Sequence, residues 1–234
     1  MNHKEHYRLD AEAFDYWADY HYTPAEKRRN QFTFKLAKVR AGQSVLDIGS
    51  GRGWFSLHAA NLGADVTALD LSASNLQRIK QEDSRINTLL ADAAEPLAID
   101  KKFDLLVALE VLEHIVNPGL AIANWKSMLK PTGRLLITVP YKELIRYSLC
   151  IHCNGKTPHN AHLHSFDKDA LGNLLIANGL RVCHLEPFSH KLPPLLRLDK
   201  ITQNFPLPIW CWLDRLCRLT GDKYHYLAAI CRLP

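Results

Sequence analysis

The chain has 234 residues, of which 47% are hydrophobic and 23% charged, and its formal net charge is +5. This length and composition suit one sizeable globular domain with a small cap. The mild excess of positive charge is dispersed, which argues against a nucleic-acid-binding protein. Because the sequence shows no signal-peptide pattern, no apolar run of about 18 residues and only six cysteines, we expect a reduced, cytoplasmic protein.

The first forty residues are polar with interspersed aromatic side chains, and residues 8–40 are predicted to be helical. Aromatic residues cluster before and after Pro24. They are Phe14, Tyr16, Trp17, Tyr20, Phe32 and Phe34. We expect residues 1–40 to form cap helices in front of residues 41–234. Packing alone would also explain the aromatic residues.

From Ser44 onward, strand-like and helix-like segments alternate, which predicts an α/β fold with a mostly parallel sheet. The expected strands are 44–48, 65–69, 86–91, 103–109, 134–139, 180–186 and 224–231. The expected helices are 53–62, 73–82, 118–129 and 168–178, and residues 130–133 are expected to form a turn. Two stretches interrupt the alternation, at about 141–166 and 187–222, and we expect them to be insertions.

A glycine-rich turn follows the first strand. Gly49, Gly51 and Gly53 alternate with other residues and lead directly into a helical pattern. Glycine allows positive φ and close approach of the backbone to a ligand, and the helix start adds free N–H groups. The spacing differs from that of a dinucleotide fold and lacks the Lys of a P-loop. The turn therefore predicts a site for another nucleoside-type cofactor.

Acidic residues stand at or near the ends of the first three strands. Asp47 precedes the glycines, Asp70 closes the second strand, and Asp92 closes the third. Ligands of open parallel sheets bind at the carboxyl ends of the strands. We expect Asp70 to accept hydrogen bonds from a ribose diol, Asp92 to accept from an adenine amino group, and Asp47 to orient the turn or face the cofactor.

Residues 45–55, 68–72, 91–93, 103–114 and 129–135 together resemble the motifs of class I S-adenosylmethionine-dependent methyltransferases. They are similar to the branch that includes the ubiquinone-biosynthesis O-methyltransferases. The resemblance implies a Rossmann-like, seven-stranded sheet with an antiparallel last strand and S-adenosyl-L-methionine as cofactor. Ser50 departs from the cysteine that many relatives carry. The cofactor-binding residues implied are Asp47, Gly49, Gly51, Gly53, Asp70, Leu71, Asp92, Ala93 and Glu110.

The segment after the fourth strand carries candidate catalytic groups. In a helix, Glu110, Glu113 and His114 would share one face. They could hold a divalent metal, His114 could act as a general base, or the pattern could be structural. We assign His114 a catalytic role and leave the metal open.

The first insertion is rich in cysteine and histidine. Cys150, Cys153, His162 and His164 could form a tetrahedral zinc site, although the spacing fits no standard zinc finger. We instead expect a loop on the substrate side in which His162 or His164 reaches the acceptor. A surface loop with solvated histidines is the third alternative. The residues assigned as catalytic are His114 and His162, with no metal ligand assigned.

The second insertion is a candidate lid. Trp210 and Trp212 begin an apolar pattern that continues through Leu216 and Leu219, with arginines nearby. Such a segment can cover a greasy substrate, contact a membrane surface through 205–219, or pack as a capping helix.

We therefore expect an enzyme that transfers a methyl group to a small-molecule or lipid-intermediate acceptor, with a hydroxyl as the favoured group. Two alternatives remain at this point. One is a methyltransferase that acts on a protein or nucleic acid, and the other is a non-catalytic S-adenosylmethionine-binding protein. Neither the acceptor atom nor the oligomeric state follows from the sequence.

Overall fold

The fold is described by a computed structural model, which places residues 23–97, 99–150 and 153–234. A seven-stranded sheet lies at its centre, in the order β3-β2-β1-β4-β5-β9-β8. Its strands are β1 (Ser44–Ile48), β2 (Asp65–Asp70), β3 (Asn87–Leu90), β4 (Phe103–Leu109), β5 (Leu129–Pro140), β8 (Arg181–His190) and β9 (Tyr224–Arg232). β1 to β5 pair in parallel and β9 runs antiparallel to both of its neighbours. The predicted Rossmann-like fold is confirmed.

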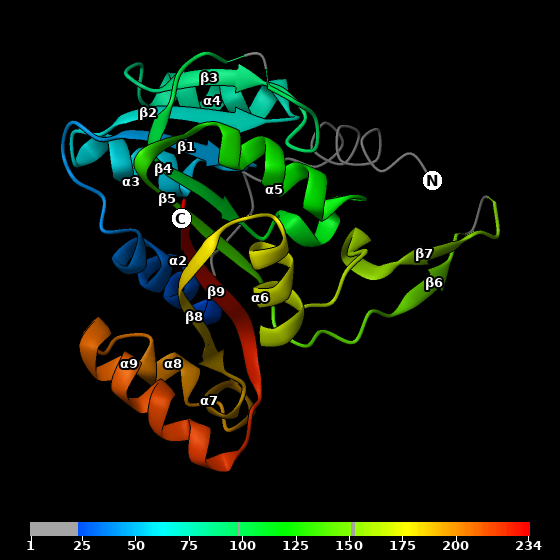
Figure 1. Ribbon diagram of the computed structural model, residues 1–234. Helices are drawn as coiled ribbons and strands as arrows, with labels where there is room; N and C mark the ends of the chain where they lie inside the picture. The colour runs from blue at the N-terminus through cyan, green and yellow to red at the C-terminus, as the bar shows by residue number, and fades with distance from the viewer. Residues whose placement is uncertain (1–22, 98, 151–152) are drawn as a thin grey trace.

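Helices cover both faces of the sheet (Figure 1). One face packs against α5 (Pro118–Ser127) and α6 (Lys168–Ala177), through residues such as Trp125 and Leu171. The other packs against α2 (Pro24–Ala37), α3 (Trp54–Asn61) and α4 (Ala73–Glu82). This two-sided burial explains why β1 is buried along its whole length.

The predicted helical span of 8–40 contains α2 from residue 24 to residue 37, and residues 8–22 lie outside the described residues. α2 begins after Thr23, whose side chain accepts from the Glu26 amide while Glu26 accepts from the Thr23 amide, forming a capping box. It ends before Lys38, which has a φ of 45°. The expected aromatic cluster before Pro24 lies outside the described residues. The part that is described carries Phe32, which stacks on Phe188 of β8 with ring centroids 4.4 Å apart.

The strand predicted at 180–186 continues to His190, so the second insertion begins at Lys191 rather than at 187. Pro187 pairs with Leu227 and Phe188 with Tyr226, so both residues belong to the strand. β8 is the edge of the sheet, where a missing N–H removes no ladder bond on the open side. A proline is therefore tolerated here.

The turn predicted at 130–133 lies within β5. Leu129 pairs with Phe103, but the next paired residue is Arg134, opposite Leu105. The residues between them are extra on β5 and form a bulge-like irregularity within it. The helix before it ends at Ser127, two residues earlier than predicted.

The two insertions follow the neighbouring carboxyl ends of β5 and β8 and extend from the core in different directions (Figure 1). The first contains the hairpin β6 (Tyr147–Leu149) and β7 (Lys156–Pro158), followed by the short 3-10 helix η2 (His159–Ala161). The second contains α7 (Leu192–Leu195), α8 (Asp199–Thr202), α9 (Leu207–Leu216) and the 3-10 helix η3 (Cys217–Thr220). Among the described helices, none is long and apolar enough to cross a bilayer.

Candidate active site

The glycine turn joins β1 to α3 at the carboxyl edge of the sheet. Gly49, Gly51 and Gly53 all have positive φ, at 67°, 50° and 68°. A Cβ on Gly49 would lie 2.6 Å from Val111 Cγ2, and one on Gly53 would lie 2.5 Å from Ile79 Cγ1. A Cβ on Gly51 would meet nothing within 4 Å. Two glycines therefore permit close packing, whereas Gly51 faces open space where a ligand can approach.

The predicted strand-end acids surround this turn. The Gly51 amide donates to Asp70 Oδ2 at 2.7 Å, and the Ser72 amide donates to Asp70 Oδ1 at 2.9 Å. Asp47 is buried and accepts from the Ser56 hydroxyl at 2.7 Å. Burial is the main cause that raises the pKa of Asp47, to about 6, and that also raises the pKa of Asp70. Both acids thus fix the shape of the turn.

The other predicted cofactor residues lie on neighbouring strand ends. Asp92 follows β3, and its Oδ1 accepts from the Ala94 amide at 2.9 Å. Ala93 is buried, and its carbonyl accepts from the indole of Trp125 at 2.8 Å. Leu71 is half-buried next to Asp70. The side chains predicted from three separate strands therefore lie along one edge of the sheet.

Glu110 and Glu113 do not share a helix face, which corrects the expected arrangement. Glu110 has a φ of 58°, and only Leu112–His114 form a 3-10 helix, η1. Glu110 Oε1 accepts from the Thr138 hydroxyl at 2.8 Å, whereas both carboxylate oxygens of the fully buried Glu113 lack a hydrogen-bond partner. Burial, and then the charge of Glu110, raise the pKa of Glu113 well above its ordinary value. Burial therefore favours the neutral form of Glu113, and a cation bound beside it would favour the carboxylate.

The two histidines assigned as catalytic lie together. The rings of His114 and His162 have centroids 4.7 Å apart, and His162 Nδ1 contacts Glu143 Oε2. Burial, and then the neighbouring His162, lower the pKa of His114 to about 4, so His114 is neutral at physiological pH. The sequence analysis missed Glu143 because no motif marks it. Its only signal was its place at the start of the first insertion.

A cavity of about 680 Å³ opens beside these groups. It is lined by α2, the carboxyl ends of β4 and β5, the first insertion and β9, and its lining includes Arg29, Glu113, Glu143, His162 and Tyr226. Residues far apart in the sequence thus enclose one space near the glycine turn. Its size and mixed lining suit a small organic ligand.

The residues considered for zinc do not come together. Cys150 and Cys153 belong to the β6–β7 hairpin, and His164 Nε2 lies 2.9 Å from the carbonyl of Ile115. In the part of the chain that the structure describes, the one group of potential metal ligands is Glu113, His114 and His162, whose ligand atoms lie within 4.8 Å of one another.

Two adjacent arginines of α2 lie in different environments. Arg28 is buried and donates to the carbonyls of Thr202 and Phe205 at 2.5 and 2.6 Å, so it attaches α2 to the second insertion. Arg29 lies 4.0 Å from Glu110 and lines the cavity. Only Arg29 is placed to meet a ligand.

The sheet order, the glycine turn and the row of strand-end acids define the class of S-adenosylmethionine-dependent methyltransferases with a Rossmann-like fold. Residues 16–185 match the sequence model of a family described as a methyltransferase domain. The chain belongs to this family and is an enzyme that uses S-adenosyl-L-methionine.

Curated relatives include the ubiquinone biosynthesis O-methyltransferase of Glaesserella parasuis serovar 5 (strain SH0165). It is 32% identical over 177 residues, which cover 70% of this chain and 72% of the relative. The enzyme of the same name from Rickettsia akari (strain Hartford) is 32% identical, over 58% of this chain and 56% of the relative. Several further relatives of this name match over about half of their length.

Among solved structures, the chain is similar to the 1,6-didemethyltoxoflavin-N1-methyltransferase of Burkholderia thailandensis. That structure contains its acceptor and S-adenosylhomocysteine. The TM-score is 0.63 at 20% identity, and the match covers 98% of this chain and 84% of the other. At this identity the similarity supports the fold alone.

Proposed function

We propose that the enzyme transfers the methyl group to a hydroxyl of a small or lipid-like acceptor held in the 680 Å³ cavity. The cofactor would bind along Asp47, Gly49, Gly51, Gly53, Asp70, Leu71, Asp92, Ala93 and Glu110. Residues 1–40 would form the cap, and residues 41–234 the methyltransferase domain with its two insertions. The relatives named as O-methyltransferases support an oxygen acceptor. The observation that carries the proposal is a pair of histidines beside a cavity at the strand ends.

The pair His162–Glu143 has the arrangement of an oriented base. With Nδ1 donating to the Glu143 carboxylate, Nε2 keeps its lone pair and can accept the proton of an acceptor hydroxyl. His114 packs edge-on against this ring and, being neutral, adds no competing charge. The methyl transfer itself requires alignment of the acceptor oxygen with the sulfonium carbon in a dry pocket.

We expect the purified enzyme to transfer labelled methyl from S-adenosylmethionine to the lipid fraction of a cell extract, as a base-stable ether. His162→Ala should lower kcat by about 100-fold or more, because the proton acceptor is lost. His159→Ala is the matched control, since His159 is exposed and its side chain hydrogen-bonds to Ser148 rather than to a group of the cavity. Label that enters RNA or protein in place of lipid would contradict the proposed acceptor.

The histidine pair, together with Glu113, could also hold a divalent ion. A metal-assisted reaction is therefore the alternative that an experiment must distinguish from catalysis by a histidine base. The unpartnered oxygens of Glu113, with His114 and His162, would hold the ion, and the ion would lower the pKa of a bound hydroxyl. If His162 acts as the base without an ion, the Glu113 carboxylate takes no part in the reaction, so Glu113→Gln and exhaustive dialysis against EDTA should both leave kcat within about threefold of wild type. Activity that is lost on dialysis and restored by Mg²⁺ or Zn²⁺ would assign the role to the ion.

We also propose that the enzyme is cytoplasmic and contacts membrane surfaces through 205–219. On α9 and η3, Trp210 packs inward against Phe32, whereas Trp212, Leu216 and Leu219 are exposed. Arg218 lies in the same stretch, so apolar and positively charged groups occur together. Such a surface suits the boundary between lipid headgroups and acyl chains.

Sedimentation with vesicles that contain phosphatidylglycerol tests this contact. Wild-type protein should co-sediment, and Trp212→Ser with Leu219→Ser should reduce the bound fraction several-fold, because exposed apolar area is removed without changing the core. The control is Leu90→Ser, which replaces an exposed leucine on β3 at the other side of the molecule. Equal binding by the two variants would exclude this surface.

A further inference from the structure

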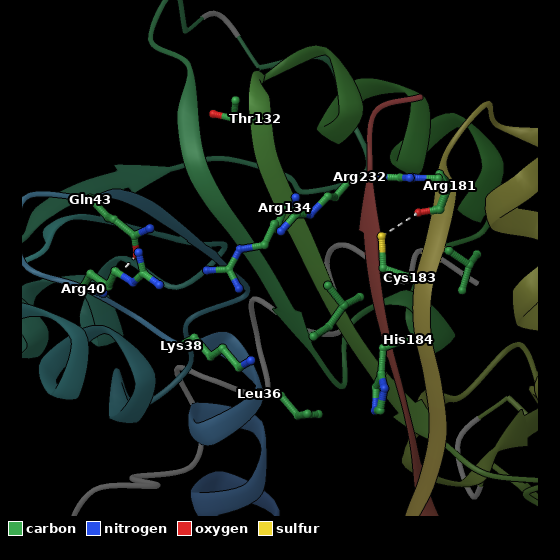
Figure 2. Close-up of a pocket in the computed structure, with 12 residues that line it drawn as sticks. Leu36, Lys38, Arg40, Gln43, Thr132, Arg134, Arg181, Cys183, His184 and Arg232 are labelled. Carbon is green, nitrogen blue, oxygen red and sulfur yellow. Dashed lines mark hydrogen bonds between the residues drawn. The ribbon is translucent and has the colours of Figure 1, made fainter.

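A second, strongly basic cavity lies away from the active site. Its volume is about 900 Å³, and it is lined by the end of α2, the loop before β1 and parts of β5, β8 and β9 (Figure 2). It sits where β5 and β8 begin and β9 ends, whereas the active site lies at the carboxyl ends of the parallel strands. The basic residues that line it are Lys38, Arg40, Arg134, Arg181, His184 and Arg232. We call this cavity the basic cleft.

Three of these residues form a row across adjacent strands. Arg134 on β5 lies directly opposite Arg232 on β9, and Arg232 lies directly opposite Arg181 on β8. Residues that are opposite one another in antiparallel strands point to the same face, and like charges in such positions are destabilising. With neighbouring strands about 5 Å apart, the row spans about 10 Å. Because this arrangement costs stability, the three arginines indicate a role other than stabilising the sheet.

Among the residues that the structure describes, no acidic side chain compensates the row. The lining contains no aspartate or glutamate, and within the described residues Lys38, Arg40, Arg181 and Arg232 form no ion pair. His184, by contrast, already contacts Glu186 at 3.1 Å.

The arginine at the centre of the cleft is held in place. Arg134 donates to the carbonyl of Ala37 at 2.8 Å, which directs its side chain toward the end of α2. Burial, and then the charges of Arg232 and Arg40, lower the pKa of Arg134, so the cations repel one another through the cleft. An anion between them would remove this repulsion.

We propose that the basic cleft binds a small anion that carries two or more phosphate groups. Planar guanidinium groups bind phosphate oxygens in pairs, and three of them about 5 Å apart match neighbouring phosphates better than a single anion. Gln43 and Thr132 at the rim add neutral hydrogen-bonding groups. S-adenosylmethionine is excluded as the ligand because its sulfonium and amino groups are positive. This site is independent of the proposed acceptor.

Calorimetric titration with inorganic pyrophosphate at fixed ionic strength tests the site. We expect saturable binding to the wild-type protein, weakened at least about tenfold in Arg181→Gln/Arg232→Gln. Both of these side chains are exposed, so the variant should fold. The control variant Arg85→Gln/Lys101→Gln removes two surface charges that are already paired with Asp83 and Asp65, and it should bind as wild type does.

Thermal unfolding gives a second readout that does not depend on activity. Without anion, Arg181→Gln/Arg232→Gln should be at least as stable as wild type, because repulsion in the row is relieved. With saturating pyrophosphate the order should reverse, since only wild type gains binding energy. A variant that is less stable under both conditions and binds pyrophosphate unchanged would overturn the proposal.

Two further titrations test whether the phosphate groups belong to a lipid or a nucleic acid instead of a small anion. Vesicles rich in phosphatidic acid and a single-stranded oligonucleotide are each titrated against the same pair of variants. We expect neither to compete with pyrophosphate at equal phosphate concentration. Tighter, variant-sensitive binding of the vesicle or the oligonucleotide would replace the small anion by that partner and overturn the proposal.

Discussion

Replacing Asp70 by alanine should weaken S-adenosylmethionine binding by about 10- to 100-fold. The carboxylate lies at the carboxyl end of β2, where the proposed ribose diol would donate to it, and it also holds the Gly51 amide at 2.7 Å. Loss of hydrogen bonds to a charged acceptor costs about 1.5–3 kcal/mol, which corresponds to a weakening of binding by about 10- to 100-fold. Calorimetry with S-adenosylhomocysteine measures the change directly.

The matched control for this variant is Asp65→Ala. Asp65 begins the same strand at the opposite end, where it is exposed and paired with Lys101 at 2.7 Å. Its removal should leave cofactor affinity unchanged. If Asp70→Ala binds the cofactor as tightly as Asp65→Ala does, the proposed cofactor site is wrong, although the chain still belongs to the methyltransferase family.

The sequence predicts the glycine turn and the strand ends beside it, for a physical reason. Strand periodicity, turn glycines and strand-end acids are local signals, and a parallel sheet brings the ends of consecutive strands to one edge. Gly49, Gly51, Gly53 and Asp70 could therefore be placed before any coordinates were known. The turn needs no information about distant parts of the chain.

The acceptor side could not be predicted in the same way because it depends on long-range contacts. Glu143 matters only because folding places it against His162, and neither residue lies in a motif that announces the pair. Glu110 would share a face with Glu113 and His114 only in a helix, but it has a φ of 58° and its carboxylate accepts from Thr138.

Strand pairing late in the chain is a second feature that no local pattern reveals. Arg134, Arg181 and Arg232 are far apart in the sequence and become neighbours only through the register of β5, β9 and β8. Pro187 is a similar case, since a proline is tolerated within β8 only because β8 is the edge strand of the sheet. Sheet order decides both, and sheet order is a property of the whole fold.

Gly53→Ala should be the most destabilising single substitution in the cofactor turn, lowering the free energy of unfolding by about 2–4 kcal/mol. The residue has a φ of 68°, which costs an L-residue about 1 kcal/mol or more. The added Cβ would also lie 2.5 Å from Cγ1 of the fully buried Ile79, and overpacking of this kind costs about 1–3 kcal/mol. Urea titration followed by circular dichroism measures the loss.

Gly51→Ala separates the two causes, because Gly51 also has positive φ but a Cβ there meets nothing within 4 Å. It should lose only about 1 kcal/mol of stability, the backbone cost alone. If the clash with Ile79 is the larger cause in Gly53→Ala, adding Ile79→Ala removes both Cγ1 and Cδ1, which would lie 2.5 and 2.9 Å from the new Cβ, and the double variant should be less destabilised than the sum of the single variants. Additive losses would show that backbone strain, and not packing against α4, requires glycine at this position.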